Sequence, residues 1–339
     1  MDIKELIFNV AVLFIMMLPG VILKKCKLVT ENFGKGISNL VLYIAQPALI
    51  VNAYYECSLS FSDIWLNVVY ILIFSLIAHS IFTTGAMCLF KKAERDKKKM
   101  LRFATLFSNA AFMGIPLIKA IFGPEAAIYA SVYNITYNLF LWTLGVYICT
   151  RDENEDLDKD GDVDFVDELI AVKRTTKSEV SIIKVLLHPV TIASLIGFTF
   201  LIFGINSNEV DLGIVSSSLS MLTGLVAPLS MLVIGLRLAD INFNGFINDK
   251  HMYLFIALRH FILPLLVIAV LKVASLLFTF PILVGDVIVI MAAAPAASSA
   301  TMFAEKYDCN AVYVSRLVAV STILSIVTMP IIVTLFHLI

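Results

Sequence analysis

Residues 101–120 read LRFATLFSNAAFMGIPLIKA, an apolar run in which the pair Ser108-Asn109 is followed about two turns later by Gly114-Ile115-Pro116. About 20 apolar residues is the length that an α-helix needs to cross a lipid bilayer. A proline inside such a helix removes one backbone donor and displaces a carbonyl from its partner, and lipid cannot satisfy the freed groups. The stretch therefore predicts a broken membrane-spanning helix whose freed polar groups must be satisfied by something other than lipid.

The whole chain has the same apolar character. Of its 339 residues 60% are apolar and 15% are charged, and the mean hydropathy is +0.92. Such values are far from those of a soluble globular protein, and the apolar runs are about twice as long as the strands of a membrane barrel. We expect an all-α integral membrane protein with ten transmembrane helices. The predicted spans are 5–24, 36–55, 65–90, 101–120, 126–149, 183–204, 212–237, 252–278, 285–304 and 310–337.

Lysine and arginine are distributed unevenly between the two sides that ten spans define. Most of the 25 basic residues lie in the loops after spans 1, 3, 5, 7 and 9, for example Lys24 and Lys25 after the first span. Basic loops stay in the cytoplasm. We therefore predict a multi-pass protein of the plasma membrane, with both termini outside and the long loop 150–182 in the cytoplasm.

This loop separates two sets of five spans, residues 1–149 and 183–339. Because five is odd, a relationship between the two sets would have to be an inverted repeat. Three pairs of similar residues support such a repeat, each pair about 180 residues apart. They are Pro47 and Pro228, Pro116 and Pro295, and Tyr129 and Tyr313. We predict two inverted five-helix repeats in which helices 4 and 9 hold matching positions and are both broken at prolines.

Matched broken helices point to the binding site of a secondary transporter. The half-helix N-termini at such breaks present unpaired N–H groups and a partial positive charge, which suits a carboxylate. The alternative is that the prolines only kink packed helices. We predict that Asn109, Ser298 and Ser299 contact the substrate and that Gly114, Pro116 and Pro295 create the two breaks.

Charged and polar residues inside the spans also favour an anion. All Asp and Glu residues fall in loops or at helix ends, so we expect no buried carboxylate that could hold a cation or carry a proton. Arg259 and Arg316 lie inside spans 8 and 10 and could supply supporting charge, whereas Arg237 closes span 7. The alternative is that these arginines reach the lipid headgroups, which we favour for Arg237.

Span 5 presents Asn134, Asn138 and Trp142 on one helix face, because they are spaced four residues apart. Polar amides in a membrane helix must face protein or a cavity. This face therefore either lines a pathway or bonds to neighbouring helices, and we include Asn134 and Asn138 among the candidate substrate contacts.

Residues 109–117, together with Asn134 and Trp142, resemble the fourth and fifth helices of the auxin efflux carrier family, and Pro228 and Pro295 are similar to its second half. That family includes plant auxin exporters and microbial malate and malonate permeases. The resemblance implies ten helices in two inverted repeats, helices 4 and 9 crossing at their prolines, and an elevator-like movement. It also places the family's carboxylate-contacting asparagine on Asn109.

In two respects the chain departs from that family. Helix 9 carries Ser298 and Ser299 where no matching polar residue is evident, which leaves the substrate open. The long hydrophilic central loop of the plant members is absent, which favours the bacterial and archaeal permeases.

The loop 150–182 contains a pattern typical of an EF-hand calcium site. Residues 156–167 read DLDKDGDVDFVD, with oxygen ligands at positions 1, 3, 5 and 9 and glycine at position 6. Position 12 is aspartate instead of the usual glutamate. Binding of Ca²⁺ or Mg²⁺ and a solvated, disordered linker are both open readings. The candidate ligands are Asp156, Asp158, Asp160, Asp162, Asp164 and Asp167.

Together these features predict a secondary transporter of small organic anions, namely auxin-like or malate-like and malonate-like carboxylates. Alternatives are a sodium-coupled anion symporter on a related fold and a membrane receptor or sensor that reads Ca²⁺ at the central loop. An enzyme is disfavoured, because no span holds paired carboxylates or a Ser/His/Asp set. The expected partners are a small carboxylate and membrane lipid, with no nucleic acid, no required cofactor, and a homodimer left open.

Overall fold

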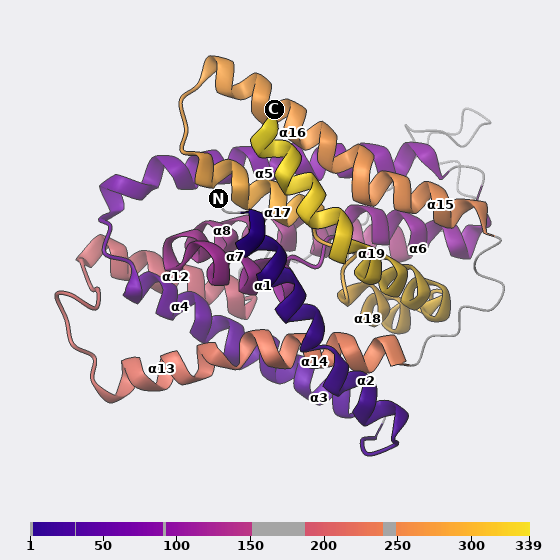
Figure 1. Cartoon of the computed structure of the whole chain (residues 1–339), viewed down its shortest axis with the longest axis horizontal. Coiled ribbons are helices and arrows are strands. Elements are labelled where there is room, and N and C mark those ends of the chain that lie inside the picture. Colours follow the sequence, from indigo (N-terminus) through magenta and orange to yellow (C-terminus); the bar gives the residue numbers. More distant parts are fainter. Residues whose placement is uncertain (1–2, 31, 91–92, 151–186, 240–248) are drawn as a thin grey trace.

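The computed structural model describes residues 3–30, 32–90, 93–150, 187–239 and 249–339, and these form helices and turns without a regular strand (Figure 1). In the first half the helices are α1 (Ile3–Ile15), α2 (Leu18–Lys25), α3 (Phe33–Leu40), η1 (Val41–Ala45), α4 (Gln46–Glu56), α5 (Phe61–Leu89), α6 (Arg95–Leu106), η2 (Ala110–Gly114), α7 (Ile115–Phe122), α8 (Pro124–Phe140), η3 (Leu141–Gly145) and α9 (Val146–Thr150). In the second half they are α12 (Pro189–Phe203), α13 (Ile214–Gly224), α14 (Val226–Ala239), α15 (Lys250–Ala257), η4 (Leu258–Ile262), α16 (Leu263–Leu277), α17 (Ile282–Ala293), α18 (Ser299–Lys306) and α19 (Ala311–Leu338).

Six helices in the described part of the chain are long and apolar enough to cross a membrane, and they coincide with predicted spans 1, 2, 3, 7, 8 and 10. They are Ile7–Lys25, Phe33–Glu56, Phe61–Leu89, Ile214–Ala239, Lys250–Leu277 and Ala311–Leu338. The other predicted spans correspond to shorter or interrupted helices, among them Ala110–Phe122, Pro189–Phe203 and Ile282–Ala293. The all-helical class is therefore confirmed, while ten crossings, the inverted repeat and the boundaries at 149 and 183 stay predictions.

Four of the helical segments, η1 to η4, are wider π-helical turns, and three of them have a proline as their cause. η1, η2 and η4 end two residues before Pro47, Pro116 and Pro264, respectively. Proline cannot donate a backbone hydrogen bond, and its ring crowds the carbonyl four residues earlier. A single π turn accommodates the ring without ending the helix. These three prolines therefore widen their helices and do not break them.

The described helices pack as two groups. In the first group α2 and α3 pack against α14, and α12 and α13 pack against α4. In the second group α5, α6, α7 and α8 pack together with α17, α18 and α19. Figure 1 shows α13, α14, α2, α3 and α4 along the lower side, with α5, α15 and α16 along the upper side. The two helix groups meet where α4 and α12 lie against α8 and where α14 lies against η2.

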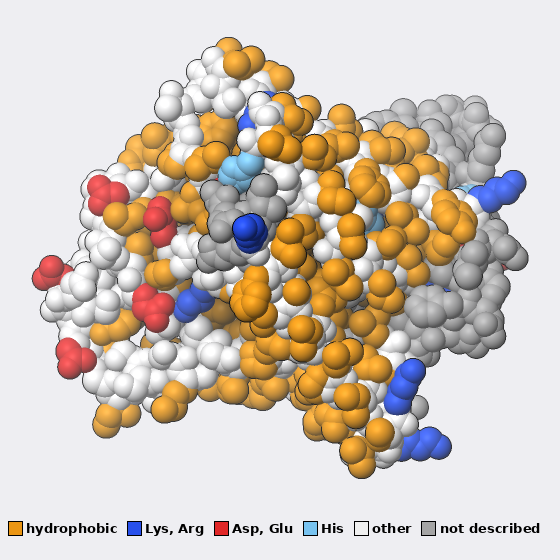
Figure 2. Space-filling model, in the orientation of Figure 1, with side chains coloured by type: hydrophobic (Ala, Val, Ile, Leu, Met, Phe, Trp, Pro, Cys, Tyr) orange, Lys and Arg blue, Asp and Glu red, His pale blue; other side chains and the backbone are white. Residues whose placement is uncertain are grey.

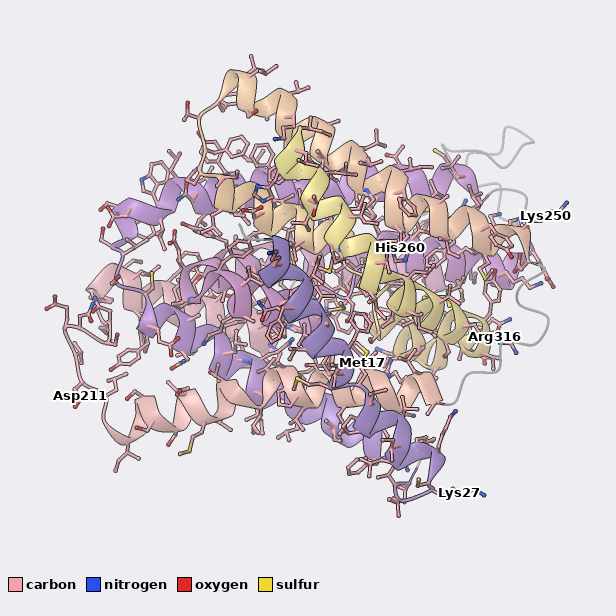
Figure 3. The ribbon with its side chains drawn as sticks, viewed as in Figure 1. Met17, Lys27, Asp211, Lys250, His260 and Arg316 are labelled. Atoms are coloured by element: carbon pink, nitrogen blue, oxygen red, sulfur yellow. The ribbon has the colours of Figure 1, made fainter. Side chains whose placement is uncertain are left out.

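The outer surface is strongly apolar. Many large hydrophobic side chains are exposed, such as Leu276 at 82% and Met221 at 78%. Figure 2 shows hydrophobic side chains over the middle of this face, with acidic residues gathered at its left end. Figure 3 places Asp211 at that end and Lys27 and Lys250 at the opposite end. Such a surface is unfavourable in water and suits contact with lipid.

Candidate functional site

Two helices are interrupted at the centre of the molecule, and the interruptions lie side by side. α6 ends at Leu106 before η2 begins at Ala110, and α17 ends at Ala293 before α18 begins at Ser299. The two extended segments form an isolated antiparallel bridge between Ser108 and Ala296. The Asn109 N–H donates to the Pro295 carbonyl at 2.7 Å, and the Ala297 N–H donates to the Phe107 carbonyl at 2.9 Å. We call segments 107–109 and 294–298 the crossing, where each break satisfies backbone groups of the other.

The first break is not where the sequence predicted it. It lies at 107–109, upstream of Pro116, and Pro116 instead occupies the first turn of α7. Pro116 needs no more than the π turn η2 before it, so the prediction that it breaks the helix is wrong. Gly114 has a packing role, because a Cβ atom there would lie 2.5 Å from the Met291 sulfur of α17. Pro295, by contrast, lies within the second break.

Arg259 on η4 binds the ends of both interrupted helices. Its side chain is buried, with 1% of the residue exposed, and its guanidinium lies 4.7 Å from the Phe82 ring centroid. It donates to the Ala294 carbonyl and, at 3.4 Å, to the Thr105 carbonyl. The C-terminal ends of α6 and α17 carry partial negative charge, which a cation stabilises. Arg259 lines neither of the two cavities described below, so it is placed to hold the crossing.

A second buried contact to the crossing comes from α19. The Ala296 N–H donates to the Ser321 hydroxyl at 2.8 Å, and Ser321 lies 2.9 Å from His260 Nε2. His260 Nδ1 lies 2.8 Å from the Thr328 hydroxyl. Since Ser321 accepts from the amide, its own proton is available for Nε2, and this network assigns the His260 proton to Nδ1. These partners are far apart in the chain, so no sequence pattern predicts them.

Replacing Ser321 by alanine should loosen the crossing. The substitution leaves the buried Ala296 N–H and His260 Nε2 without a partner, which costs about 1–3 kcal/mol. We expect a lower midpoint of thermal unfolding for the purified Ser321→Ala protein. The matched control is Ser325→Ala, because Ser325 is also buried on α19 but bonds to the Thr322 carbonyl of its own helix. Equal midpoints for the two variants would contradict this role of Ser321.

A cavity of about 560 Å³ opens beside the crossing, and we call it the crossing cavity. Several predicted site residues meet there, from the crossing segment 107–109 and from α8, η3 and α18. They are Asn109, Asn134, Asn138, Trp142 and Ser299. Lys35, Arg237, Glu305 and Lys306 also line it.

Several polar atoms of the crossing cavity lack partners in the described structure. Asn109 Nδ2, Asn134 Oδ1 and Trp142 Nε1 are buried without a hydrogen bond to any described residue. Ser299 is 3.3 Å from the Tyr137 hydroxyl, and Asn138 is 3.4 Å from His188 Nδ1. Buried polar groups are normally hydrogen-bonded, so the three unpaired groups are available to a bound polar molecule.

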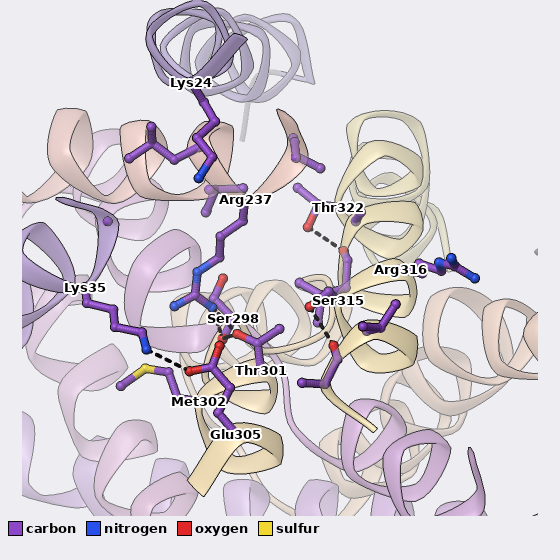
Figure 4. Close-up of a pocket in the computed structure, with 18 of the residues that line it drawn as sticks. Lys24, Lys35, Arg237, Ser298, Thr301, Met302, Glu305, Ser315, Arg316 and Thr322 are labelled. Atoms are coloured by element: carbon purple, nitrogen blue, oxygen red, sulfur yellow. Dashed lines mark hydrogen bonds and ion pairs between the residues drawn. The ribbon is translucent and has the colours of Figure 1, made fainter. Parts of the chain in front are cut away.

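A second cavity of about 410 Å³, which we call the side cavity, adjoins the first (Figure 4). Lys35, Arg237, Met302 and Glu305 line both cavities. The predicted contact Ser298 and the predicted cation Arg316 line the side cavity and not the crossing cavity. Figure 4 shows the Arg316 side chain directed away from Arg237 and Ser298. The predicted site residues are thus distributed over two cavities.

Arg237 does not follow the prediction that it reaches the lipid headgroups. From the last turn of α14 its Nη1 donates to the Ser298 carbonyl and to the Thr301 hydroxyl, both on the second helix group. Figure 4 shows the side chain extending to these two residues. Its position at the end of a span was visible in the sequence. The partners were not, because Ser298 follows it by about 60 residues.

The expectation that the spans hold no buried carboxylate is wrong. Asp286 on α17 is buried, with 2% of the residue exposed, and its Oδ1 lies 2.6 Å from His337 Nε2 near the end of α19. Buried charged groups need such a partner. The pair lines neither cavity.

The calcium-loop prediction falls outside the described residues. Asp156, Asp158, Asp160, Asp162, Asp164 and Asp167 all lie between 151 and 186. Among the described residues no cluster of three or more His, Cys, Asp or Glu side chains could hold a metal ion. Binding of Ca²⁺ or Mg²⁺ by the central loop therefore stays a prediction.

Comparison with known proteins gives the family of the chain. A family model described as "Membrane transport protein" matches residues 6–333, which is nearly the whole chain. The chain is 27% identical over 319 residues to an uncharacterized transporter of Methanothermobacter thermautotrophicus, with 93% of each protein covered. The apolar helices and the paired breaks agree with such a protein. The chain therefore belongs to the membrane transport protein family, the auxin efflux carrier family, and is a membrane transporter and not an enzyme.

Proposed function

We propose that this transporter is a secondary carrier of small organic anions that bear a carboxylate. The observation that supports this most directly is the crossing cavity, where the unpaired amide of Asn109 stands next to the paired helix breaks. The first turn of η2 and the N-terminus of α18 begin at this point. Amide donors and helix N-termini stabilise a carboxylate.

The charges around the cavity support the same substrate class. Lys35, Arg237 and Lys306 line it, against one acidic residue, Glu305. The Glu305 carboxylate lies 3.1 Å from Lys35 Nζ, so part of its charge is already balanced. Lys306 Nζ lies 5.6 Å from the Trp142 ring centroid. A cavity with this surplus of cations attracts an anion and disfavours a cation.

We further propose alternating access of the elevator type, in which the second helix group slides along the first. Two ion pairs join the groups at opposite ends of the span Phe33–Glu56, namely Lys35 with Glu305 at 3.1 Å and Glu56 with Lys119 at 3.2 Å. Solvent-exposed pairs of this kind contribute about 0–1 kcal/mol each. Such weak contacts can break and reform during a movement. We place the Lys27 and Lys250 end in the cytoplasm, from the distribution of basic residues.

Counterflow in liposomes tests the proposal. The purified protein would be reconstituted into liposomes loaded with unlabelled acetate, malonate, malate or indole-3-acetate. Exchange for the same labelled compound outside would be measured with and without a sodium gradient. We expect exchange of at least one carboxylate. Exchange that requires sodium would favour the sodium-coupled alternative, and binding without net flux would favour a receptor.

Asn109→Ala should lower the rate of this exchange by about tenfold or more, because a charge-assisted hydrogen bond to the substrate is lost. The matched control is Asn67→Ala, since Asn67 bonds to the Tyr129 hydroxyl at 3.0 Å and lines neither cavity. Both variants should insert normally, as judged by size-exclusion profiles in detergent. Unchanged exchange by the Asn109 variant would remove this residue from the site.

A further inference from the structure

Arg237 stands at the junction of the two cavities. It lies in the last turn of α14, in the first helix group, and lines both the crossing cavity and the side cavity. The residues it holds, Ser298 and Thr301, belong to the break and the first turn of α18 in the second helix group. An anion in either cavity therefore lies beside the Arg237 guanidinium.

The Arg237 guanidinium contacts the protein through one nitrogen, Nη1, and leaves Nε and Nη2 open. Nη1 makes both contacts, to the Ser298 carbonyl and to the Thr301 hydroxyl. Nε and Nη2 have no hydrogen-bond partner among the described residues, and neither atom is sealed from solvent in the way that the Arg259 Nε is. Nε and Nη2 together form the fork that binds the two oxygens of one carboxylate. This fork is therefore open toward the cavities.

The charge of Arg237 is also left without a direct counter-ion. No described carboxylate lies within ion-pair distance of it, and the acidic residue of the junction, Glu305, pairs with Lys35. Taking a cation out of water is costly unless an anion accompanies it. Glu305 lies close enough to act on Arg237 through its charge but forms its ion pair with Lys35. The open fork and the lack of a direct ion pair among the described residues both point to an anionic ligand with two acceptor oxygens.

We propose that Arg237 is a second carboxylate-binding site of the carrier, distinct from Asn109, and that it binds a carboxylate through Nε and Nη2 while Nη1 holds the Ser298 carbonyl. This proposal rests on the proposed function, because it names a residue that contacts the same class of substrate. It has a structural consequence: a carboxylate bound at Arg237 contacts the first helix group beside the break of the second. Occupancy of this site is thereby linked to the position of one group relative to the other.

Two substitutions of Arg237 test the site in the full-length protein. Arg237→Lys keeps the positive charge but loses the fork, and Arg237→Gln loses the charge. We expect the KM for exchange of the transported carboxylate to rise about tenfold or more in Arg237→Lys, since at least one charge-assisted hydrogen bond is lost. Arg237→Gln should raise it further. Lys119→Gln is the matched control, because it removes a cation that also joins the two groups but lines neither cavity.

A labelling experiment keeps the test independent of transport and of how well the variants fold. Phenylglyoxal, which reacts with accessible guanidinium groups, would be applied to the wild-type protein, and the modification of Arg237 would be followed by mass spectrometry. We expect Arg237 to be modified, and acetate, malonate, malate or indole-3-acetate to slow the modification. The neutral compound malonamide should not protect it.

The outcomes separate this proposal from the proposed function. If the wild type exchanges a carboxylate while Arg237→Lys keeps the wild-type KM, or while carboxylates fail to protect Arg237, the second site is wrong and the carrier function stands. If KM rises equally in Arg237→Lys and Lys119→Gln, Arg237 serves only to join the helix groups. If the wild type neither exchanges nor binds any of the four carboxylates, the proposed function fails, and this site fails with it.

Discussion

Replacing Gly235 by valine should prevent accumulation of the folded protein. A Cβ atom on Gly235 would lie 2.0 Å from the Met17 carbonyl oxygen and 2.9 Å from the Met17 carbonyl carbon. On the facing helix, a Cβ atom on Gly20 would lie 2.3 Å from the Leu232 carbonyl oxygen. These are backbone atoms, so no side-chain rotation can make room, and α2 would have to separate from α14. Small residues are what allows membrane helices to approach this closely.

The expected loss is about 3 kcal/mol or more for valine, at the upper end of what overpacking costs. Alanine at the same position should already be destabilising, because the clash begins at Cβ. Yield and monodispersity of a fluorescent fusion, followed by thermal unfolding in detergent, measure the effect. Gly36→Ala is the matched control, since a Cβ atom there meets nothing within 4 Å. Equal stability of the Gly235→Ala and Gly36→Ala proteins would show that the two helices are not closely packed here.

Arg259→Ala should be the most damaging substitution near the crossing. It leaves the Ala294 and Thr105 carbonyls without their donor and removes the cation from two helix C-termini. A hydrogen bond from a charged group contributes about 1.5–3 kcal/mol, and a favourably placed cation at a helix end contributes up to about 2 kcal/mol. We therefore expect a loss of several kcal/mol in the free energy of unfolding and no transport at growth temperature. Thermal unfolding of the purified variant is the measurement.

Arg259→Lys refines this expectation, because an ammonium keeps the charge but cannot span both carbonyls as the guanidinium fork does. Its stability should fall between those of the wild type and Arg259→Ala. The control is Lys272→Ala, which removes a cation that lies 4.7 Å from the Phe336 ring centroid and should cost below about 1 kcal/mol. An Arg259→Ala protein as stable as Lys272→Ala would show that the crossing does not need this arginine.

The two breaks could be anticipated from the sequence, but the position of the first could not. Polar and small residues beside proline in an apolar run mark where a membrane helix is weak. At Pro295 the helix does break. At Pro116 the wider turn η2 absorbs the ring, and the break occurs instead at Ser108, where the backbone finds its partner Ala296. That partner is remote in the sequence, so local pattern alone cannot select between the two positions.

Much of the polar lining of the crossing cavity was predictable from local sequence. Asn134, Asn138 and Trp142 are placed on one face by helix geometry alone. The roles of the two arginines were not predictable, because each depends on a hydrogen bond to a carbonyl on another helix. Arg259 donates to the Ala294 carbonyl and Arg237 donates to the Ser298 carbonyl. An arginine near the end of a span can reach the headgroups or a neighbouring break, and its sequence position is the same in both cases.

The hydrogen bonds that close the crossing run between backbone atoms, from the Asn109 and Ala297 amides to the Pro295 and Phe107 carbonyls. No exchange of one ordinary side chain for another deletes these donors, and at either amide position it would take a proline to do so. Relatives that transport different solutes could thus vary the polar residues around the cavity freely while the main-chain scaffold stays the same. Diversification of cargo and preservation of architecture then depend on separate sets of atoms.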